Sequence, residues 1–441
     1  MSNIAVPSRT EPASAARAPG APKADRVTKA LRTGMAAAIL TILLVSFTPF
    51  QTQSDATAES GNLVNQLGYG AIGALALVGH VLFTERAAAM ALLRPTWLVF
   101  AAWMLFSVTQ SEVPDASLRA VLFSLLAMAA ATGAVCLPPT ARDFRAALAI
   151  AALAVLGLSY AGLVLLPDLA IHTASGDEPE HAGLWRGIYS HKNVAGPVMA
   201  GLFFAGIYLL RGGARRRGWL VMLLAALFVA KTGSKTSAGL VPLVALLVAG
   251  GRSLGGRVLP ALMLVAIVGV MALLTLGAAI SPLLNDILQT ILPGTTFTGR
   301  MDLWRFALDV MHDRQWTGWG FESFWGTDVV RGSERPFELS WDPRGIVNSH
   351  SGYLEIAIAM GWPALGVAAL MLLVLPVKDY LTCRPDLENA RFADFCMMVL
   401  TFVLMNSFLE SYLFARNQPV WMLAFMAIVG LRLAARLRMV S

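Results

Sequence analysis

The sequence predicts an all-α polytopic membrane protein with about twelve transmembrane helices, and three observations support this prediction. Of the 441 residues, 56% are hydrophobic and only 14% are charged, and the mean hydropathy is +0.64. Apolar stretches of about twenty residues, long enough to cross the hydrocarbon core of a bilayer, recur along the chain. The sequence lacks the short alternating segments that are typical of a membrane β-barrel.

Charge placement predicts the orientation of these helices. The net charge is +7, but Lys and Arg lie mainly in alternate loops, as the positive-inside rule predicts for a membrane protein rather than a nucleic-acid-binding protein. The first outer loop, 51–66, contains acidic residues but no basic ones. With an even number of spans, both termini are expected in the cytoplasm. Segments 167–193 and 281–349 are then expected on the outer face, which is the periplasmic face in a Gram-negative cell.

Taken in order, the chain divides into four regions. Residues 1–30, rich in Ala, Pro and Ser, are expected to form a disordered cytoplasmic tail. Residues 31–280 are expected to hold the first nine spans, 281–349 a large outer loop, and 350–441 the last three spans. The spans are predicted near 34–50, 67–84, 95–109, 118–137, 144–166, 194–210, 218–231, 236–250, 258–280, 350–376, 392–410 and 419–435.

The centres of these spans are almost free of ionisable side chains. His80 lies near a predicted inner end, and Lys231 and Lys235 lie at a predicted outer end. Ion-coupled transporters usually keep such groups in the middle of the membrane. Their placement at span ends therefore counts against a transporter.

Two outer segments carry basic groups where a predicted span begins. Arg186, His191, Lys192 and Asn193 precede the span near 194–210. A helix N-terminus with a guanidinium nearby is a suitable anion site, although the same groups can simply extend to the membrane surface. The turn from Lys231 to Ser237 also opens a span. It contains Lys235 and Gly233, and it can be either an anion-binding nest or a solvated turn.

The outer loop contains a predicted amphipathic helix and an aromatic run. In 298–311, Leu303, Phe306, Ala307, Val310 and Met311 recur with helical spacing. Arg300 at the start of this helix is the better anion ligand, whereas Arg305 on its polar side is expected to be structural. The aromatic run from Trp316 to Trp325, with Trp341 further on, can stack on sugar rings or lie at the membrane interface.

His350 lies at the start of the tenth predicted span. A helix N-terminus favours the neutral imidazole, which can accept a proton from a hydroxyl group, but a histidine at this position can also be a simple polar cap. Asp177, Glu178, Glu180 and His181 have no specific metal-ligand spacing, so no metal site is predicted. Together, the four segments place basic or imidazole groups on one face of the membrane. Their expected ligand is an anion at the membrane surface, most naturally a lipid pyrophosphate.

The chain resembles the O-antigen ligase and O-antigen/exopolysaccharide polymerase superfamily over roughly 180–410. The resemblance rests on Arg186-Gly-Ile-Tyr-Ser-His-Lys-Asn193, Thr232-Gly-Ser-Lys-Thr236, Gly299-Arg-Met-Asp-Leu-Trp304 and Ser349-His-Ser-Gly-Tyr-Leu-Glu355. The Ser-His-Lys-Asn form looks most like the exopolysaccharide-polymerase branch. The resemblance implies a membrane glycosyltransferase-type bundle, a large outer loop over the site and an undecaprenyl-pyrophosphate-linked glycan donor.

The resemblance also implies roles for particular residues. The functional arginines of the family would fall on Arg186, on Arg300 and on the position of Lys235, and the functional histidine would be His350. Lys235 stands where arginine is usual, so bidentate phosphate binding is lost there. Ser351 follows His350 where asparagine is common.

These observations predict a metal-independent, inverting glycosyltransferase of the bacterial inner membrane that needs no cofactor. His350 would be the base. Arg186, Lys235 and Arg300 would bind the pyrophosphate, with Lys192 and Asn193 beside them. A polymerase is favoured, and the alternatives are a ligase that moves glycan to lipid A-core or another acceptor, and a glycan or lipid transporter. The expected partners are the lipid-linked oligosaccharide, the glycan acceptor, the bilayer and a chain-length regulator, but no nucleic acid.

Overall fold

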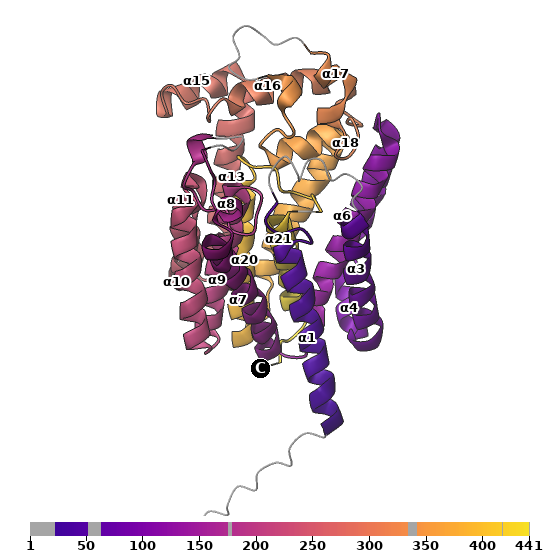
Figure 1. Ribbon diagram of the computed structural model, residues 1–441, viewed down its shortest axis with the longest axis vertical. Helices are drawn as coiled ribbons and strands as arrows, with labels where there is room; N and C mark the ends of the chain where they lie inside the picture. Colours follow the sequence, from indigo (N-terminus) through magenta and orange to yellow (C-terminus); the bar gives the residue numbers. More distant parts are fainter. Residues whose placement is uncertain (1–22, 52–62, 175–178, 334–341, 417, 441) are drawn as a thin grey trace, which may run out of the picture.

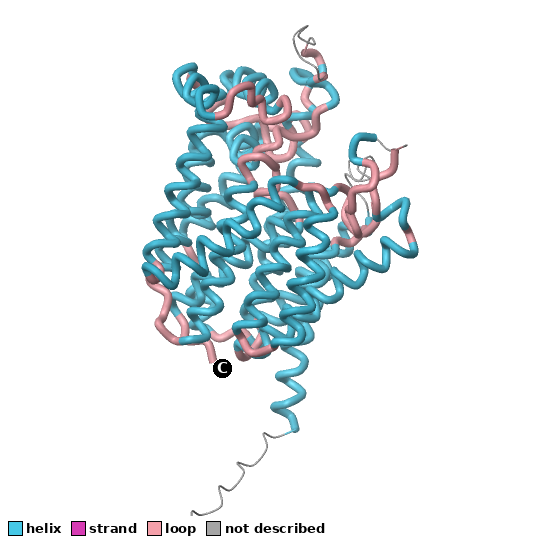
Figure 2. Tube along the Cα trace, turned by 90° about the vertical axis from the view of Figure 1, so that its left-hand side faces the viewer, coloured by secondary structure: helices cyan, strands magenta, loops and turns pink. Residues whose placement is uncertain are grey.

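The computed structural model describes residues 23–51, 63–174, 179–333, 342–416 and 418–440. Within these residues the secondary structure is helical, apart from one isolated bridge between Ile171 and Trp185. Long helices run side by side as a bundle, and shorter helices lie across one end of it (Figure 1). Figure 2 shows that the longer loops gather mainly at that same end. The predicted all-α membrane fold is confirmed.

Each of the twelve predicted spans coincides with a helix or a run of helices. Counting only the described residues, nine segments are long and apolar enough to cross a membrane alone, and α4 with α5, bent by 56°, makes a tenth. The helices that correspond to the twelve predicted spans are α1 (Lys23–Val45), α3 (Leu63–Phe83), α4 (Arg86–Leu92) with α5 (Pro95–Ser107), α6 (Pro114–Cys136), α7 (Ala141–Leu165), α9 (Lys192–Arg211), α10 (Arg215–Lys231), α11 (Lys235–Ala245) with α12 (Gly251–Gly255), α13 (Val258–Ala272) with α14 (Ala278–Ile280), α18 (Gly352–Ala369) with α19 (Leu375–Leu381), α20 (Leu387–Asn406) and α21 (Pro419–Arg436).

Two of the predicted spans, α10 and α20, fall outside this group of ten. Helix α10 has only 17 residues. Helix α20 begins with Glu388, Arg391 and Asp394, yet nearly all of it from Asn389 onward is buried by other helices. A helix enclosed by protein does not need a lipid-facing apolar surface. Length and composition therefore support nine or ten crossings in the described part of the chain, fewer than the twelve predicted.

The boundary predicted for the N-terminal tail is too late. Helix α1 begins at Lys23, so residues 23–30 form its first two turns rather than part of a disordered tail. The sequence there, with Lys, Ala and Arg, favours a helix, and Asp25 complements the positive end of the helix dipole. The rest of the predicted tail, 1–22, lies outside the described residues.

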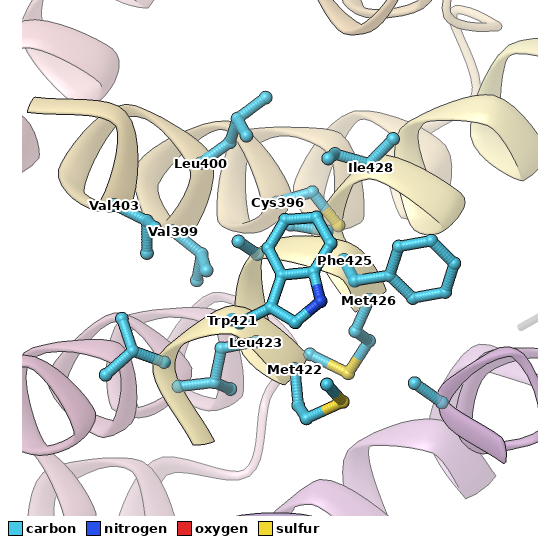
Figure 3. Packing of buried hydrophobic residues seen from close by; sticks show 14 of the residues in the cluster. Cys396, Val399, Leu400, Val403, Trp421, Met422, Leu423, Phe425, Met426 and Ile428 are labelled. Atoms are coloured by element: carbon cyan, nitrogen blue, oxygen red, sulfur yellow. The ribbon is translucent and has the colours of Figure 1, made fainter. Parts of the chain in front are cut away.

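Helices α9, α20 and α21 form the centre of the bundle and are almost completely buried. Figure 3 shows Trp421 of α21 among side chains of α20 and α21, including Cys396 and Val399 of α20. Small residues allow this close approach, because a Cβ atom at Gly430 would lie 2.8 Å from Cys396 Sγ. The outer ends of these rigid helices therefore make a fixed platform for the loops between them.

The segment 281–349 forms a cap over this platform, with helices α15 (Pro282–Ile291), α16 (Arg300–Met311) and α17 (Asp328–Arg331) (Figure 1). The predicted amphipathic helix is confirmed as α16. Its buried face comprises Met301, Leu303, Trp304, Ala307 and Met311.

Main-chain hydrogen bonds hold the cap on a break in α18. Gly361 has φ 80° inside that helix, and Pro363 follows it without an N–H group. The break frees carbonyl groups, and those of Ile358 and Ala359 accept the N–H groups of Trp319 (2.9 Å) and Gly320 (3.0 Å). Replacing these helical bonds with bonds from the cap fixes its position over the outer end of the bundle.

Candidate active site

The carboxylate of Glu410, in the loop between α20 and α21, joins three separate segments of the chain. Its Oε1 accepts hydrogen bonds from Arg300 Nη2 and Asn193 Nδ2, each at 2.9 Å. Its Oε2 lies 3.4 Å from His350 Nδ1. The fold thus brings the start of α9, the start of α16 and the segment that leads into α18 together around one acidic side chain.

Local backbone geometry presents Arg300 and Asn193 to this carboxylate. Gly299 adopts φ 82°, a conformation that favours glycine, and turns the chain so that α16 begins at Arg300. Asn193 lies in the first turn of α9, where its N–H donates to His191 Nδ1 at 3.1 Å. The Tyr412 hydroxyl donates to the carbonyl of Asn193, so the loop that carries Glu410 is tied to the same turn.

His350 is held in a strained conformation by bonds on both sides. It has φ 51°, uncommon for a residue with a side chain, and its N–H donates to Asn348 Oδ1 at 3.0 Å. The next helix is tied to the Glu410 loop, because the Gly352 N–H donates to the carbonyl of Glu410 at 3.0 Å. Such over-determined backbone strain is typical of functional sites.

Two buried polar contacts fix the residue before His350. The Ser349 carbonyl accepts the indole N–H of Trp304 at 2.9 Å. The Ser349 N–H donates to Glu355, whose carboxylate also accepts the indole N–H of Trp325 at 2.9 Å. Trp304 belongs to α16 and Trp325 to the aromatic run, so the cap itself positions the histidine.

The electrostatics of the cluster favour an ionised Glu410. Burial alone raises the pKa of this carboxyl, but the hydrogen bond with His350 and the charge of Arg300 outweigh burial and lower the pKa below its ordinary value. A carboxylate opposite Nδ1 assigns the proton to that nitrogen and leaves Nε2 as the basic nitrogen. The His350 side chain is 38% exposed, so a ligand can reach it.

This lowered pKa predicts a pH-dependent contribution to stability. The contribution is complete above the ordinary carboxyl pKa of about 4.3 and is lost as the pH falls through the lower pKa of the folded state. At pH 7 the thermal midpoint of the wild type is therefore expected to exceed that of Glu410→Gln. The difference should shrink below about pH 4. Equal midpoints at pH 7 would show that the cluster does not stabilise the cap.

The other predicted anion ligands lie outside this cluster. Arg186 is buried, and its guanidinium donates to the carbonyls of Ser190 (3.1 Å) and Asp168 (3.3 Å) within its own loop. Burial lowers the pKa of Arg186. Lys235 is the first residue of α11 and is exposed on the outer surface. Its turn packs behind α9, since a Cβ atom at Gly196 would lie 2.9 Å from Ser237 Oγ.

Three histidines surround the start of α9, and no sequence pattern singled out His172 among them. The rings of His172, His181 and His191 have centroids 5.0 to 5.7 Å apart. His172 Nε2 accepts the Lys192 N–H at 3.2 Å, and His191 Nδ1 is likewise an acceptor.

Metal binding was given little weight from the sequence, and the described residues contain no group of three His, Cys, Asp or Glu side chains placed to hold an ion. Of the four residues considered as cation ligands in the sequence, Asp177 and Glu178 lie outside the described part of the chain. Glu180 lies 3.6 Å from His181 Nδ1.

Sequence reasoning did not select Glu410 or Glu355 as site residues. Glu410 lies in a short outer turn between two apolar spans, and Glu355 lies in the first turn of α18. An acidic residue beside a membrane span, on the face that gathers cations, is a signal for both, and Glu355 also ends the motif that begins at Ser349.

A cavity of about 430 Å³ adjoins the cluster. Ser190, Asn348 and Ser411 line it, and each is a close chain neighbour of a residue in the cluster. The opposite walls come from the outer ends of α1 and α3, from the aromatic run and from α18. An ion pair between Arg416 and Glu322, 2.8 Å long, also faces this space.

The aromatic run divides between two roles. Phe321 and Trp325 line the cavity, Trp319 and Phe324 are buried in the cap, and Trp316 is 65% exposed. The first pair suits sugar stacking, and the exposed Trp316 suits the membrane interface. Trp341 lies outside the described residues.

Comparison with known protein families gives a match over part of the chain. A search of curated proteins gave no match. Residues 219–369 match the family model described as O-antigen ligase, a region that includes Lys235, Arg300 and His350. This match covers less than half of the chain and, together with the multi-pass helical fold, supports its resemblance to the O-antigen ligase and polymerase superfamily.

Proposed function

We propose that this protein polymerises undecaprenyl-pyrophosphate-linked glycan units on the outer face of the bacterial inner membrane. The observation that carries the proposal is the Glu410 cluster, which brings a cation and an imidazole together next to residues that line a large cavity. A pyrophosphate ester is already activated, so transfer needs a base and a stabilised leaving group but no nucleotide. The loop charges support an orientation with both termini in the cytoplasm.

His350 acts as the base in this proposal. Its Nε2 accepts the proton of an acceptor hydroxyl while the hydroxyl oxygen bonds to the anomeric carbon of the donor sugar. The bond from that carbon to the pyrophosphate oxygen breaks, and its electron pair leaves with the pyrophosphate. Attack from the side opposite the leaving group inverts the anomeric configuration. Glu410 holds the imidazole in the required tautomer and stabilises the imidazolium that forms.

Arg300 stabilises the departing pyrophosphate without a metal ion. Glu410 engages one terminal nitrogen of its guanidinium, which has five N–H donors in total. Lys192 and Lys235 flank the start of α9 and contribute positive potential on the same face. Arg186 supports the site through the loop carbonyls that it holds, and Asn193 orients Glu410.

The cavity next to the cluster is the proposed site for the acceptor glycan. Its walls combine the aromatic rings of Phe321 and Trp325 with polar groups such as Gln51 and Asn65. Stacking surfaces and hydrogen-bonding groups of this kind suit sugars. A polymerase is favoured over a ligase by the Ser190-His-Lys-Asn193 form, which looks most like the exopolysaccharide-polymerase branch.

Purified protein in detergent tests this proposal with a lipid-pyrophosphate oligosaccharide and without added nucleotide or metal. Release of undecaprenyl pyrophosphate together with extended glycan on the carrier is expected from the wild type. Release that requires added lipid A-core would instead assign a ligase. No turnover with either acceptor, in protein shown to be folded, would contradict a transferase and favour a transporter.

Arg300→Ala is expected to lower the turnover rate about ten- to a hundredfold, because a charge-assisted hydrogen bond contributes about 1.5–3 kcal/mol. Arg305→Ala is the matched control. Arg305 lies on the same helix, pairs with Asp302 at 3.6 Å on the exposed side and should leave the rate within a factor of about two. The turnover rates of both variants are measured as initial rates of carrier release. Equal effects of the two substitutions would remove Arg300 from the site.

A further inference from the structure

A second cavity, of about 230 Å³, lies at the opposite end of the bundle from the candidate active site. Helices α5, α6 and α21 form its walls, and the short α4 ends beside it. This is the end at which α1 begins and α21 finishes (Figure 1). The lining is mainly apolar, with Leu98, Met128 and Phe425 from the three helices, and Leu98 is exposed at the rim. An apolar groove that opens between membrane helices faces lipid chains.

Two arginines share a single carboxylate at this cavity. Arg94 and Arg432 both line it, and their side chains are only 10% and 18% exposed. Arg94 Nη2 donates to Asp379 Oδ2, and Arg432 Nη1 lies 3.5 Å from Asp379 Oδ1. The three groups therefore carry one positive charge in excess. Arg436 lies one helical turn beyond Arg432 and adds to it.

An excess charge in such an enclosed place is unfavourable unless an anion compensates it. The Arg432 Nε donates to the carbonyl of Ala91 at 2.9 Å, which fixes its guanidinium beside the cavity. Arg94 lies at the bend of 56° between α4 and α5, so the bend itself places a cation at the polar end of an apolar groove. An apolar groove with a cationic end matches a molecule that has a hydrocarbon chain and an anionic head.

We propose that this cavity is a binding site for an anionic phospholipid of the surrounding leaflet. The phosphate would lie against Arg94 and Arg432, and one acyl chain would follow the groove past Leu98 and Met128. Basic pockets between membrane helices bind anionic head groups in this way. The site is separate from the glycan site and is independent of the function proposed for it.

Native mass spectrometry with phosphatidylglycerol and phosphatidylcholine of identical acyl chains tests the proposal on the full-length protein. The wild type is expected to bind phosphatidylglycerol about tenfold more tightly than phosphatidylcholine, the effect of one compensated charge. Arg432→Gln should abolish this preference. Arg216→Gln should keep it, because Arg216 is exposed at the same end of the bundle on α10, away from the cavity.

A second variant tests the groove without altering a charge. Ala101 lines the cavity, and Ala101→Phe is expected to weaken binding of both lipids severalfold while the arginines remain. Equal binding of the two lipids by the wild type would overturn the proposal. So would equal losses in Arg432→Gln and Arg216→Gln, which would indicate attraction to the whole basic surface. Unchanged phosphatidylglycerol binding by Ala101→Phe would show that the lipid does not enter the groove.

Discussion

Replacing His350 by alanine is expected to lower the turnover rate of glycan transfer by about 10²–10⁴-fold, the usual contribution of a positioned base. The imidazole contacts Glu410, the His350 main-chain N–H donates to Asn348, and the side chain is 38% exposed, so an acceptor hydroxyl can reach the ring. Binding of the lipid donor should change little, because Arg300 remains in place. Initial rates of carrier release measure the first quantity, and retention of radiolabelled donor measures the second.

His312→Ala is the control for that substitution. His312 lies on the same cap, is exposed and is outside the Glu410 cluster, so its loss should leave the rate within a factor of about two. A folded His350→Ala protein that kept more than half of the wild-type rate would assign His350 to a purely structural role before α18.

Replacing Glu410 by glutamine is expected to lower the rate on the order of a hundred- to a thousandfold. Glutamine has nearly the same size but no charge. It would no longer fix the proton on His350 Nδ1, stabilise the imidazolium or pair with Arg300. The loss should appear in the turnover rate more than in the Michaelis constant for the donor, because the imidazolium forms only during the reaction.

Asp302→Asn provides the matched control for Glu410→Gln. Asp302 is also a carboxylate of the outer face, but it pairs with Arg305 on the exposed side of α16. Its loss is expected to change the rate by less than about twofold. Similar losses in the two variants would mean that the net charge of the cap, rather than the cluster, controls the reaction.

Much of the fold could be predicted from the sequence, since apolar runs of membrane-crossing length and the alternation of basic loops are local signals. The spacing of Leu303, Ala307 and Met311 predicted α16 for the same reason. The break of α18 at Gly361 could not be predicted, because the surrounding run is apolar enough to pass for one continuous span. Helix α20 was predicted from its apolar second half. Its first turns carry charged residues, which a membrane helix tolerates when other helices, rather than lipid, surround it.

The candidate site was predictable only in part. Asn193, Arg300 and His350 were selected because each lies where a helix begins on the outer face, and the structure brings all three to Glu410. Glu410 itself has no such signal, since its role depends on contacts with segments 60 to 217 residues away. Arg186 was selected for its charge, but the fold directs its guanidinium to backbone carbonyls of its own loop.

A double-mutant cycle tests most directly whether Glu410 acts through His350. Rates of carrier release would be compared for the wild type, His350→Ala, Glu410→Gln and the double variant under identical conditions. If Glu410 works by orienting the imidazole, the double variant should be at most a few-fold slower than His350→Ala alone, because the effects of residues that act as a unit are not additive. A double variant slowed by the full product of the two single effects would contradict this account.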